Sequence, residues 1–259
     1  MISVVIRNKN QATALSFLLK NLTERYHEDI AEIIVVDNLS TDSSEEVALQ
    51  FGARFVTIEN FSFGGSANVC ARAARFPIVV LFSAHSYPVS HDFFRLIQAK
   101  FDNNPNLAGL RCLHSSNDYK NFITKIPATV DPNKSGLIFS GSAFSRAVWE
   151  KHPFKEDVAT FEDKEWTVRV LREGYEIDFV ESIFSYEIKR SHRQLFFRFK
   201  NDVVGNYQLW HQEVSLVSAL KGLFFSIWNG FRSFIFDVWY AVLRFLYLFQ
   251  FNLKKPKQF

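Results

Sequence analysis

Cysteine is scarce in this chain. Its 259 residues include two cysteines, Cys70 and Cys112, and no Cys-x-x-Cys pair. The sequence therefore implies neither a zinc knot nor a disulfide framework. Cys70 falls on a predicted helix and Cys112 on a predicted strand. We expect both thiols to be buried and reduced, as is typical of a cytoplasmic protein.

The chain also lacks the patterns of a signal peptide and of a plain membrane span. The apolar stretch at the N-terminus is too short for a signal peptide and carries no cleavage site, so none is expected. Near the C-terminus, Arg232, Asp237 and Arg244 leave no uninterrupted apolar run of about 18 residues. With 47% apolar residues, the chain can still bury one substantial core, which predicts one main domain plus an appendage.

Short apolar runs alternate with helical patterns in the first third of the chain. Strands are expected at residues 2–6, 33–36, 53–59 and 78–82, and helices at 15–26, 43–51 and 66–75. Runs that are apolar throughout, rather than alternating, are typical of parallel strands buried on both faces. The order of these elements predicts a doubly wound α/β fold with a largely parallel sheet.

The segment 32–42 (EIIVVDNLSTD) carries the strongest functional signal. Asp37 stands where the buried strand should end, and ligands of open α/β sheets collect at the carboxyl ends of strands. The Ser-Thr-Asp cluster that follows can cap the next helix. A strand, an acidic tip and a capped helix make a site suited to the hydroxyl groups of a nucleotide.

Charge is distributed unevenly along the chain. Residues 189–259 contain eleven Lys/Arg and three Asp/Glu, a net charge of +8, whereas the whole chain carries +3 and the remainder therefore −5. A basic region of this kind predicts an anionic partner, either nucleic acid or lipid headgroups. Many of the 29 phenylalanines crowd into the same region, which favours lipid.

A helix over residues 223–251 would be amphipathic. Its apolar side is predicted to be Phe224, Trp228, Phe231, Ile235, Val238, Val242, Phe245 and Phe249, spaced by three and four. We favour a helix lying in the plane of a membrane surface, supported by Trp239 and the basic residues 254–257. Packing on its own domain, or a coiled-coil-like homodimer, stays open because the same positions form a heptad seam. Nucleic acid is disfavoured because single-strand binders interleave aromatic and basic residues.

Further candidate site residues lie in the middle of the chain. His85 follows the fourth predicted strand, and small residues at 140–143 would let backbone approach a ligand closely. Glu162 and Asp163 open a predicted helix, where the helix dipole stabilises anions, so simple capping is the alternative to a catalytic role. His192 precedes another helix.

Taken together, these segments resemble the family 2 glycosyltransferases of the GT-A (Rossmann-like) fold, in particular bacterial rhamnosyltransferase-like members. The resemblance covers about residues 1–205, leaving 206–259 as a helical tail. It rests on the order and spacing of 3–10 (SVVIRNKN), 32–42, 61–68 (FSFGGSAN), 140–143 (SGSA), 162–166 (EDKEW) with Arg169 and Gly174, and Ser191-His192.

The resemblance implies roles for matching positions. Nucleotide-sugar binding falls to Arg7, Asn10, Asp37, Asn38, Asp42, Asn68, Arg72, Ser83 and Ala84. The acidic pair matches the catalytic base of inverting members, with Asp163 the first choice and Glu162 the second. Such a base deprotonates the acceptor hydroxyl as it attacks the anomeric carbon. Trp166 and Arg169 would shape the acceptor side.

The chain departs from the family at the end of the fourth strand. Where the family carries Asp-x-Asp for a divalent metal, this chain has Ser83-Ala84-His85. His85 then takes the metal position, and His192 matches a second ligand found in many members. Imidazole suits Mn²⁺ better than Mg²⁺, so a Mn²⁺ site is favoured. Two alternatives stay open. In one, no metal binds and basic residues offset the diphosphate charge; in the other, the protein has lost donor binding.

The sequence thus predicts an inverting glycosyltransferase at the cytoplasmic face of a bacterial membrane. The donor would be a nucleoside diphosphate sugar, with dTDP-rhamnose the candidate that the resemblance suggests. The acceptor would be a lipid-linked saccharide of a surface polysaccharide. The alternative is a non-catalytic, membrane-tethered protein of the same fold that binds a sugar nucleotide or a glycan.

Overall fold

A computed structural model of the chain describes residues 1–188 and 190–257. They form two compact units, Met1–Trp210 and His211–Phe259. The helix that ends at Trp210 is held by the first unit. Gln208, near the end of this helix, accepts a hydrogen bond from the amide of Ala159 (2.9 Å).

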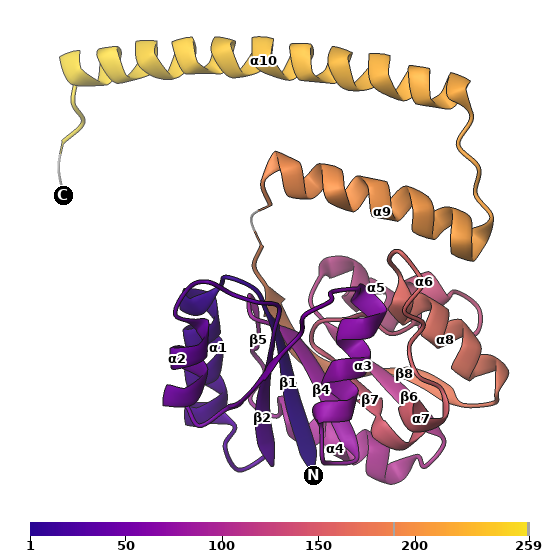
Figure 1. Cartoon of the computed structure of the whole chain (residues 1–259). Helices are drawn as coiled ribbons and strands as arrows, with labels where there is room; N and C mark the ends of the chain where they lie inside the picture. The colour runs from indigo at the N-terminus through magenta and orange to yellow at the C-terminus, as the bar shows by residue number, and fades with distance from the viewer. Residues whose placement is uncertain (189, 258–259) are drawn as a thin grey trace. The chain divides into compact units, whose positions relative to one another are not determined.

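The first unit is built on an eight-stranded sheet (Figure 1). Its strand order is β3 (Arg54–Thr57), β2 (Glu32–Asp37), β1 (Ile2–Asn8), β4 (Ile78–Ser83), β7 (Ser142–Ser145), β6 (Leu107–Leu113), β8 (Glu176–Tyr186) and β5 (Ser86–Pro88). The first four strands in this order are parallel to one another, and β6 and β8 are also parallel. β7 runs antiparallel between β4 and β6, and β5 is antiparallel to β8. The mostly parallel α/β sheet expected from the sequence is confirmed.

Helices connect the strands. They are α1 (Ala12–Arg25), α2 (Ser44–Gln50), α3 (Phe63–Ala73), α4 (Phe93–Asn103), α5 (Ser116–Ile123), α6 (Pro132–Ser135), α7 (Arg146–Lys151), α8 (Glu162–Arg172) and α9 (His192–Trp210). α3 begins three residues before the predicted position 66. The hydroxyl of Ser62 accepts a hydrogen bond from the Gly65 amide (2.9 Å) and so caps the helix earlier.

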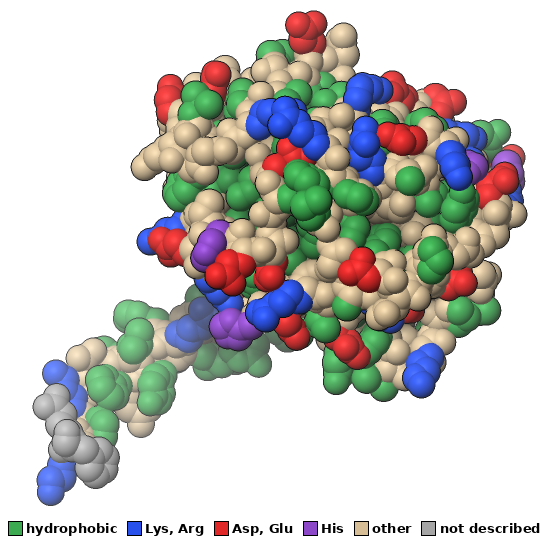
Figure 2. Space-filling model, turned by 90° about the horizontal axis from the view of Figure 1, so that it is seen from below, with side chains coloured by type: hydrophobic (Ala, Val, Ile, Leu, Met, Phe, Trp, Pro, Cys, Tyr) green, Lys and Arg blue, Asp and Glu red, His purple; other side chains and the backbone are tan. Residues whose placement is uncertain are grey.

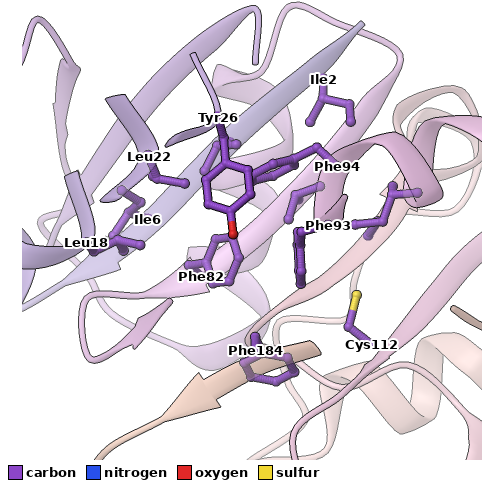
Figure 3. Close-up of a cluster of buried hydrophobic side chains, with 14 of the residues drawn as sticks. Ile2, Ile6, Leu18, Leu22, Tyr26, Phe82, Phe93, Phe94, Cys112 and Phe184 are labelled. Carbon is purple, nitrogen blue, oxygen red and sulfur yellow. The ribbon is translucent and has the colours of Figure 1, made fainter. Parts of the chain in front are cut away.

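The sheet separates two hydrophobic clusters. Val4 and Ile6 of β1 belong to one cluster and Val5 to the other, as expected when successive side chains of a strand point to opposite faces. Figure 3 shows the first cluster, in which Tyr26, directly after α1, meets aromatic rings from β4, α4 and β8. Cys112 lies in this cluster and Cys70 in the other, and both are free and buried as predicted.

The second unit contains one long helix, α10 (Leu216–Leu253), which confirms the predicted helical extension and lengthens it at its start. The Ser215 hydroxyl accepts the Ser218 amide proton and fixes that start. By length and composition α10 could cross a membrane, and none of its most apolar stretch is buried. Figure 2 shows hydrophobic and basic side chains exposed on its C-terminal part.

Candidate functional site

A cavity of about 460 Å³ opens at the carboxyl ends of β1 and β4. It is lined by residues from seven segments of the first unit, at 7–11, 38, 61–63, 83–85, 139, 160–163 and 186–201. The basic ones are Arg7, Lys9, Arg190 and Arg198, the acidic ones Glu162 and Asp163, and the aromatic ones include Phe61, Phe139, Phe161 and Tyr186. Ligands of open α/β sheets bind at this edge, so the cavity is the candidate site.

Glu162 is a buried carboxylate in the wall of this cavity. Its Oε1 lies 3.8 Å from Nη1 of Arg7, the one cation paired with it among the described residues. Burial and the neighbouring charge of Asp163 raise the pKa of Glu162 to about 7, against the opposing effect of Arg7. A carboxyl group that is half-ionised near neutral pH is suited to take up a proton during catalysis.

Asp163 is held differently from its neighbour. Its Oδ2 accepts the backbone N–H of Phe139 (3.1 Å), and its Oδ1 accepts the N–H of Lys164 (2.8 Å). These bonds tie the start of α8 to the segment before β7, which is a capping role. Asp163 still lines the cavity, and each carboxylate oxygen keeps a second lone pair.

Arg7 is positioned from two sides. Its Nη1 donates to the Ser66 hydroxyl on α3 (3.2 Å), and its guanidinium lies 5.3 Å from the centre of the Phe139 ring. Because these contacts leave the charge at the cavity wall, Arg7 can meet an anion there.

His85 presents a free imidazole nitrogen. Its Nδ1 lies 2.9 Å from Oε1 of Gln11, and because an amide oxygen can only accept, Nδ1 carries the proton. Nε2 is then an acceptor, and it is buried without a partner. Burial and the charges of Arg190 and Arg7 lower the pKa of His85 to about 4, so the ring is neutral at pH 7.

Two polar atoms of the cavity residues lack the hydrogen bonds that buried groups normally make. One is Nε2 of His85, and the other is Oδ1 of Asn8, whose Nδ2 donates to Asp37 (2.7 Å). Buried polar atoms nearly always have a hydrogen-bond partner. Two such atoms without a partner, both on residues of one cavity, therefore indicate a place for a polar ligand.

Comparison with known proteins decides the family. The family model "Glycosyl transferase family 2" matches residues 3–158, which is more than half of the chain. The chain belongs to glycosyl transferase family 2. A search of the curated proteins returned no match.

Solved structures share the fold of this glycosyltransferase. The mannosyltransferase PcManGT from Pyrobaculum calidifontis, in complex with GDP-Man and Mn²⁺, superposes with a TM-score of 0.64 at 18% identity, covering 84% of this chain and 66% of its own. Glucosyl-3-phosphoglycerate synthase from Mycobacterium tuberculosis, with Mn²⁺ and UDP-glucose, gives 0.63 at 16% identity, covering 83% and 80%. At these identities the likeness concerns the fold alone.

Several residues expected to touch the nucleotide instead build the glycosyltransferase's loop after β2. Asp37 is buried and accepts three hydrogen bonds, one from Asn8 and two from Ser40. Oδ1 of Asn10 accepts the Thr41 amide proton (2.7 Å). Asp37, Ser40 and Asn10 do not line the cavity, whereas Asn8 does, as does Asn38 in the loop after β2.

Asp42 also has a structural role. Its Oδ2 accepts the Ala12 amide proton at the start of α1 (2.9 Å), and its Oδ1 accepts from Ser44 at the start of α2. The hydrogen bond from the Ser44 hydroxyl is the largest cause that lowers the pKa of Asp42. Asp42 therefore joins two helix starts beside the cavity rather than entering it.

The residues predicted on α3 lie outside the cavity lining. Both amide atoms of Asn68 are occupied: Nδ2 donates to the Phe154 carbonyl and to Glu156, and Oδ1 accepts from Trp149 and the Phe154 amide. Arg72 is exposed. Asn68 thus holds the segment after α7 in place.

The end of β4 contributes through two of its three residues. Ser83 and His85 line the cavity. Ala84 is buried and donates its amide proton to the carbonyl of Arg7 (3.0 Å), which continues the pairing of β1 with β4. Ala84 therefore maintains the backbone geometry at the end of β4.

Trp166 is part of the hydrophobic core. Its ring is completely buried between Phe144 and Phe154, and its Nε1 donates to the His152 carbonyl (2.7 Å). Arg169 lies elsewhere, in a separate cavity of about 560 Å³, with its guanidinium on Glu165 (2.9 and 3.0 Å). Neither residue lines the candidate site, because Trp166 lies about one turn and Arg169 about two turns further along α8 than Glu162.

A metal would find one protein ligand at the expected position. Nε2 of His85 is available, and its fixed tautomer is the arrangement that histidine ligands adopt. His192 is exposed at the start of α9 and does not line the cavity. Within residues 1–188 and 190–257, no group of three or more His, Cys, Asp or Glu side chains could hold an ion. The described residues thus supply one imidazole nitrogen at this position, and further ligands to an ion would have to come from the bound donor or from water.

The sequence did not reveal several residues of the cavity. Asn8 stands in the polar string after the first predicted strand, and this position was its only signal. Arg190 and Arg198 belong to the basic C-terminal segment, and the turn of α9 brings them to the cavity. Tyr186 ends β8 and lies 4.9 Å from the His85 ring. Only the tertiary fold places these residues beside β4.

Proposed function

We propose that this glycosyltransferase transfers a sugar, with inversion, from a nucleoside diphosphate sugar to a lipid-linked saccharide acceptor. dTDP-rhamnose is the donor to test first, because of the sequence resemblance to rhamnosyltransferases. The observation that carries the proposal is the cavity itself, which joins unpaired polar atoms, basic side chains and a carboxyl group of raised pKa at the carboxyl edge of the sheet.

The basic side chains suit the diphosphate. Arg7 and Arg190 both act on the charge of His85, so both lie close to the end of β4. Guanidinium groups bind phosphate oxygens through paired hydrogen bonds. The neighbours support this assignment, since PcManGT was solved with GDP-Man and the M. tuberculosis enzyme with UDP-glucose.

A carboxylate at the start of α8 acts as the base. The acceptor hydroxyl gives its proton to this carboxylate as its oxygen bonds to the anomeric carbon, and the bond from that carbon to the diphosphate oxygen breaks. The resemblance points first to Asp163. The contacts favour Glu162, because both carboxylate oxygens of Asp163 already accept backbone N–H groups, whereas Glu162 is buried in the cavity wall and its pKa is raised to about 7. Glu162 is the base in this proposal.

A divalent cation bound at Nε2 of His85 would help to offset the charge of the leaving diphosphate. The neighbours were solved with Mn²⁺ or Mg²⁺, which supports a divalent cation in general. An imidazole ligand favours Mn²⁺ over Mg²⁺. Gln11 would orient the ring by holding Nδ1–H.

Membrane association would bring the enzyme to its acceptor at the cytoplasmic face of the cell membrane. α10 exposes its aromatic side chains, and Ser226, Asn229, Ser233 and Asp237 follow one another along one side at spacings of three and four. A helix with one polar side suits an in-plane position on an anionic surface. Homodimerisation through the same helix is the competing explanation of its exposed apolar side.

The test is calorimetric binding of UDP-, dTDP- and GDP-sugars, each with Mn²⁺, with Mg²⁺ and with EDTA. Mn²⁺-dependent binding of one donor that is lost in His85→Ala but kept in His192→Ala supports the proposal. If EDTA does not change donor binding, the divalent cation is no longer part of the proposal, and the arginine side chains alone bind the diphosphate. If no donor binds, the non-catalytic alternative replaces the enzyme.

A further inference from the structure

α9 has one side fixed to the first unit. Gln194, Phe197 and Asn201 on this side line the cavity. Further along, Gly205 is buried so closely that a Cβ atom there would lie 2.8 Å from the Phe161 ring. Gln208 then bonds the backbone at Asp157 and Ala159. These contacts fix the rotation of α9 about its axis, so its opposite side is also defined.

The opposite side of α9 is an aromatic row. Phe196, Phe199 and Tyr207 recur at helical spacing, with Leu195 beside them. Phe196 and Phe199 are each 62% exposed, and Leu195 and Tyr207 are also exposed. Contiguous exposed aromatic side chains of this kind mark a surface that meets an apolar partner. The other side of the same helix already forms a wall of the site, so this row is not part of the cavity.

The charges beside the row favour an anionic partner. Of the four basic residues in 190–200, Arg193 and Lys200 lie outside the cavity lining and near the row on the helix, whereas Arg190 and Arg198 line the cavity. Nζ of Lys200 lies 5.4 Å from the centre of the Phe196 ring, so charge and apolar surface are adjacent. On the face of the molecule seen in Figure 2, by contrast, acidic and basic side chains are interspersed.

These observations select among possible partners. A second copy meeting the row symmetrically would bring two basic segments together, which like-charge repulsion opposes. An anionic lipid surface accepts both features, because aromatic rings settle at the level of the headgroups and Lys or Arg pair with the phosphates.

We infer that the aromatic row of α9 is a membrane-contact surface for anionic lipid, separate from α10. The role of this surface in bringing the enzyme to a lipid-linked acceptor rests on the proposed function. A helix is about 10 Å across, so a surface that touches the row would lie about one helix diameter from the cavity wall formed by Gln194 and Asn201. A lipid-linked acceptor in that surface would meet the site without leaving the membrane.

Labelling of the full chain tests the inference. Because Cys70 and Cys112 are both fully buried, an environment-sensitive fluorophore attaches to an introduced cysteine alone. The test variant is Phe199→Cys, and the control is Glu45→Cys, an exposed position on α2. Each is mixed with phosphatidylcholine vesicles, with and without one-quarter phosphatidylglycerol, that carry nitroxide-labelled lipid.

The inference predicts a blue shift and several-fold stronger quenching at position 199 than at position 45, only with phosphatidylglycerol. Adding Arg193→Glu and Lys200→Glu should abolish this difference. Equal quenching at both positions, or none at 199, overturns the inference. A label at 199 that is already blue-shifted without vesicles also overturns it, and shows that α10 or a second copy covers the row.

This result is independent of catalysis. Donor binding and turnover do not enter the labelling experiment, so failure of the proposed function leaves it readable. A second measurement connects the membrane-contact surface with the proposed function. The double variant Phe196→Ser with Phe199→Ser should lower turnover of a vesicle-borne acceptor while leaving donor binding unchanged.

Discussion

The two units of this chain use hydrophobic side chains in opposite ways. In the first unit, Phe82 and Phe93 are completely buried between the sheet and its helices. In α10, Phe224 is 69% exposed and Trp228 62%. The free energy gained by removing apolar surface from water is available in the first unit from its own chain, whereas α10 needs a partner to obtain it. Similar residues therefore signal a core in one region and an interaction surface in the other.

The largest expected effect concerns the site that the first unit builds. Glu162→Gln should lower turnover by about 10²- to 10⁴-fold, since it removes a general base, while donor affinity is retained. The matched control is Glu165→Gln on the same helix, whose carboxylate pairs with Arg169 outside the cavity. Steady-state kinetics with calorimetry measures both. Normal turnover of Glu162→Gln, with loss in Asp163→Asn, would transfer the role to Asp163.

Removal of α10 tests whether its exposed apolar side chains form an interaction surface. A chain that ends at Trp210 should keep the circular dichroism of the first unit, because that unit holds its own core. It should lose most of its binding to anionic vesicles in a sedimentation assay, with a weak, salt-sensitive remainder from the basic face of α9. Unchanged vesicle binding would assign α10 to dimerisation or packing instead.

The raised pKa of Glu162 gives both a rate and a stability effect. Turnover should rise with pH through about 7 as the carboxylate forms. Because the folded state binds this proton more tightly than the unfolded state, stability should fall over the interval from about 4.5 to 7, by on the order of 1 kcal/mol per pH unit. Denaturant unfolding of Glu162→Gln, which cannot titrate, should lack this slope. An identical slope in the variant would show that another group causes it.

The smallest effect on activity is expected at Trp166. Replacing it by Phe removes the hydrogen bond to His152 and some core volume, at a cost of about 1–3 kcal/mol in unfolding free energy. Turnover at saturating acceptor should be unchanged, as it should be in Arg169→Ala. A raised KM for acceptor in the Trp166 variant, at a temperature where it is fully folded, would restore the acceptor role.

Much of the fold could be predicted because its signals are local. The apolar runs at β1, β2 and β4 require burial on both faces, and the polar cluster that ends at Asp42 marks the start of α2. Of the strands after β4, the sequence indicated only the one that contains Cys112, observed as β6. β7 and β6 pair antiparallel between distant segments, and pairing over such separations leaves little periodic trace in a sequence.

The site was predictable in position but less so in its residues. A polar residue at the end of a buried strand correctly indicates which edge of the sheet carries the site. The hydrogen bonds of Asp37 and Asn10, however, are made within the loop after β2. Whether a carboxylate faces a cavity or a backbone amide depends on a rotation about one helix or loop. That rotation is set by packing and is not encoded in residue type.

By itself, the sequence determined a parallel α/β unit of glycosyl transferase family 2, a basic aromatic C-terminal region and the absence of the expected Asp-x-Asp. These depend on residue type and spacing along the chain. Only the tertiary structure decided that Glu162 is buried beside Arg7, that Trp166 belongs to the core, and that α9 turns one side to the cavity and the other outward. Each of these depends on contacts between segments far apart in the chain, where burial and neighbouring charge set what a side chain can do.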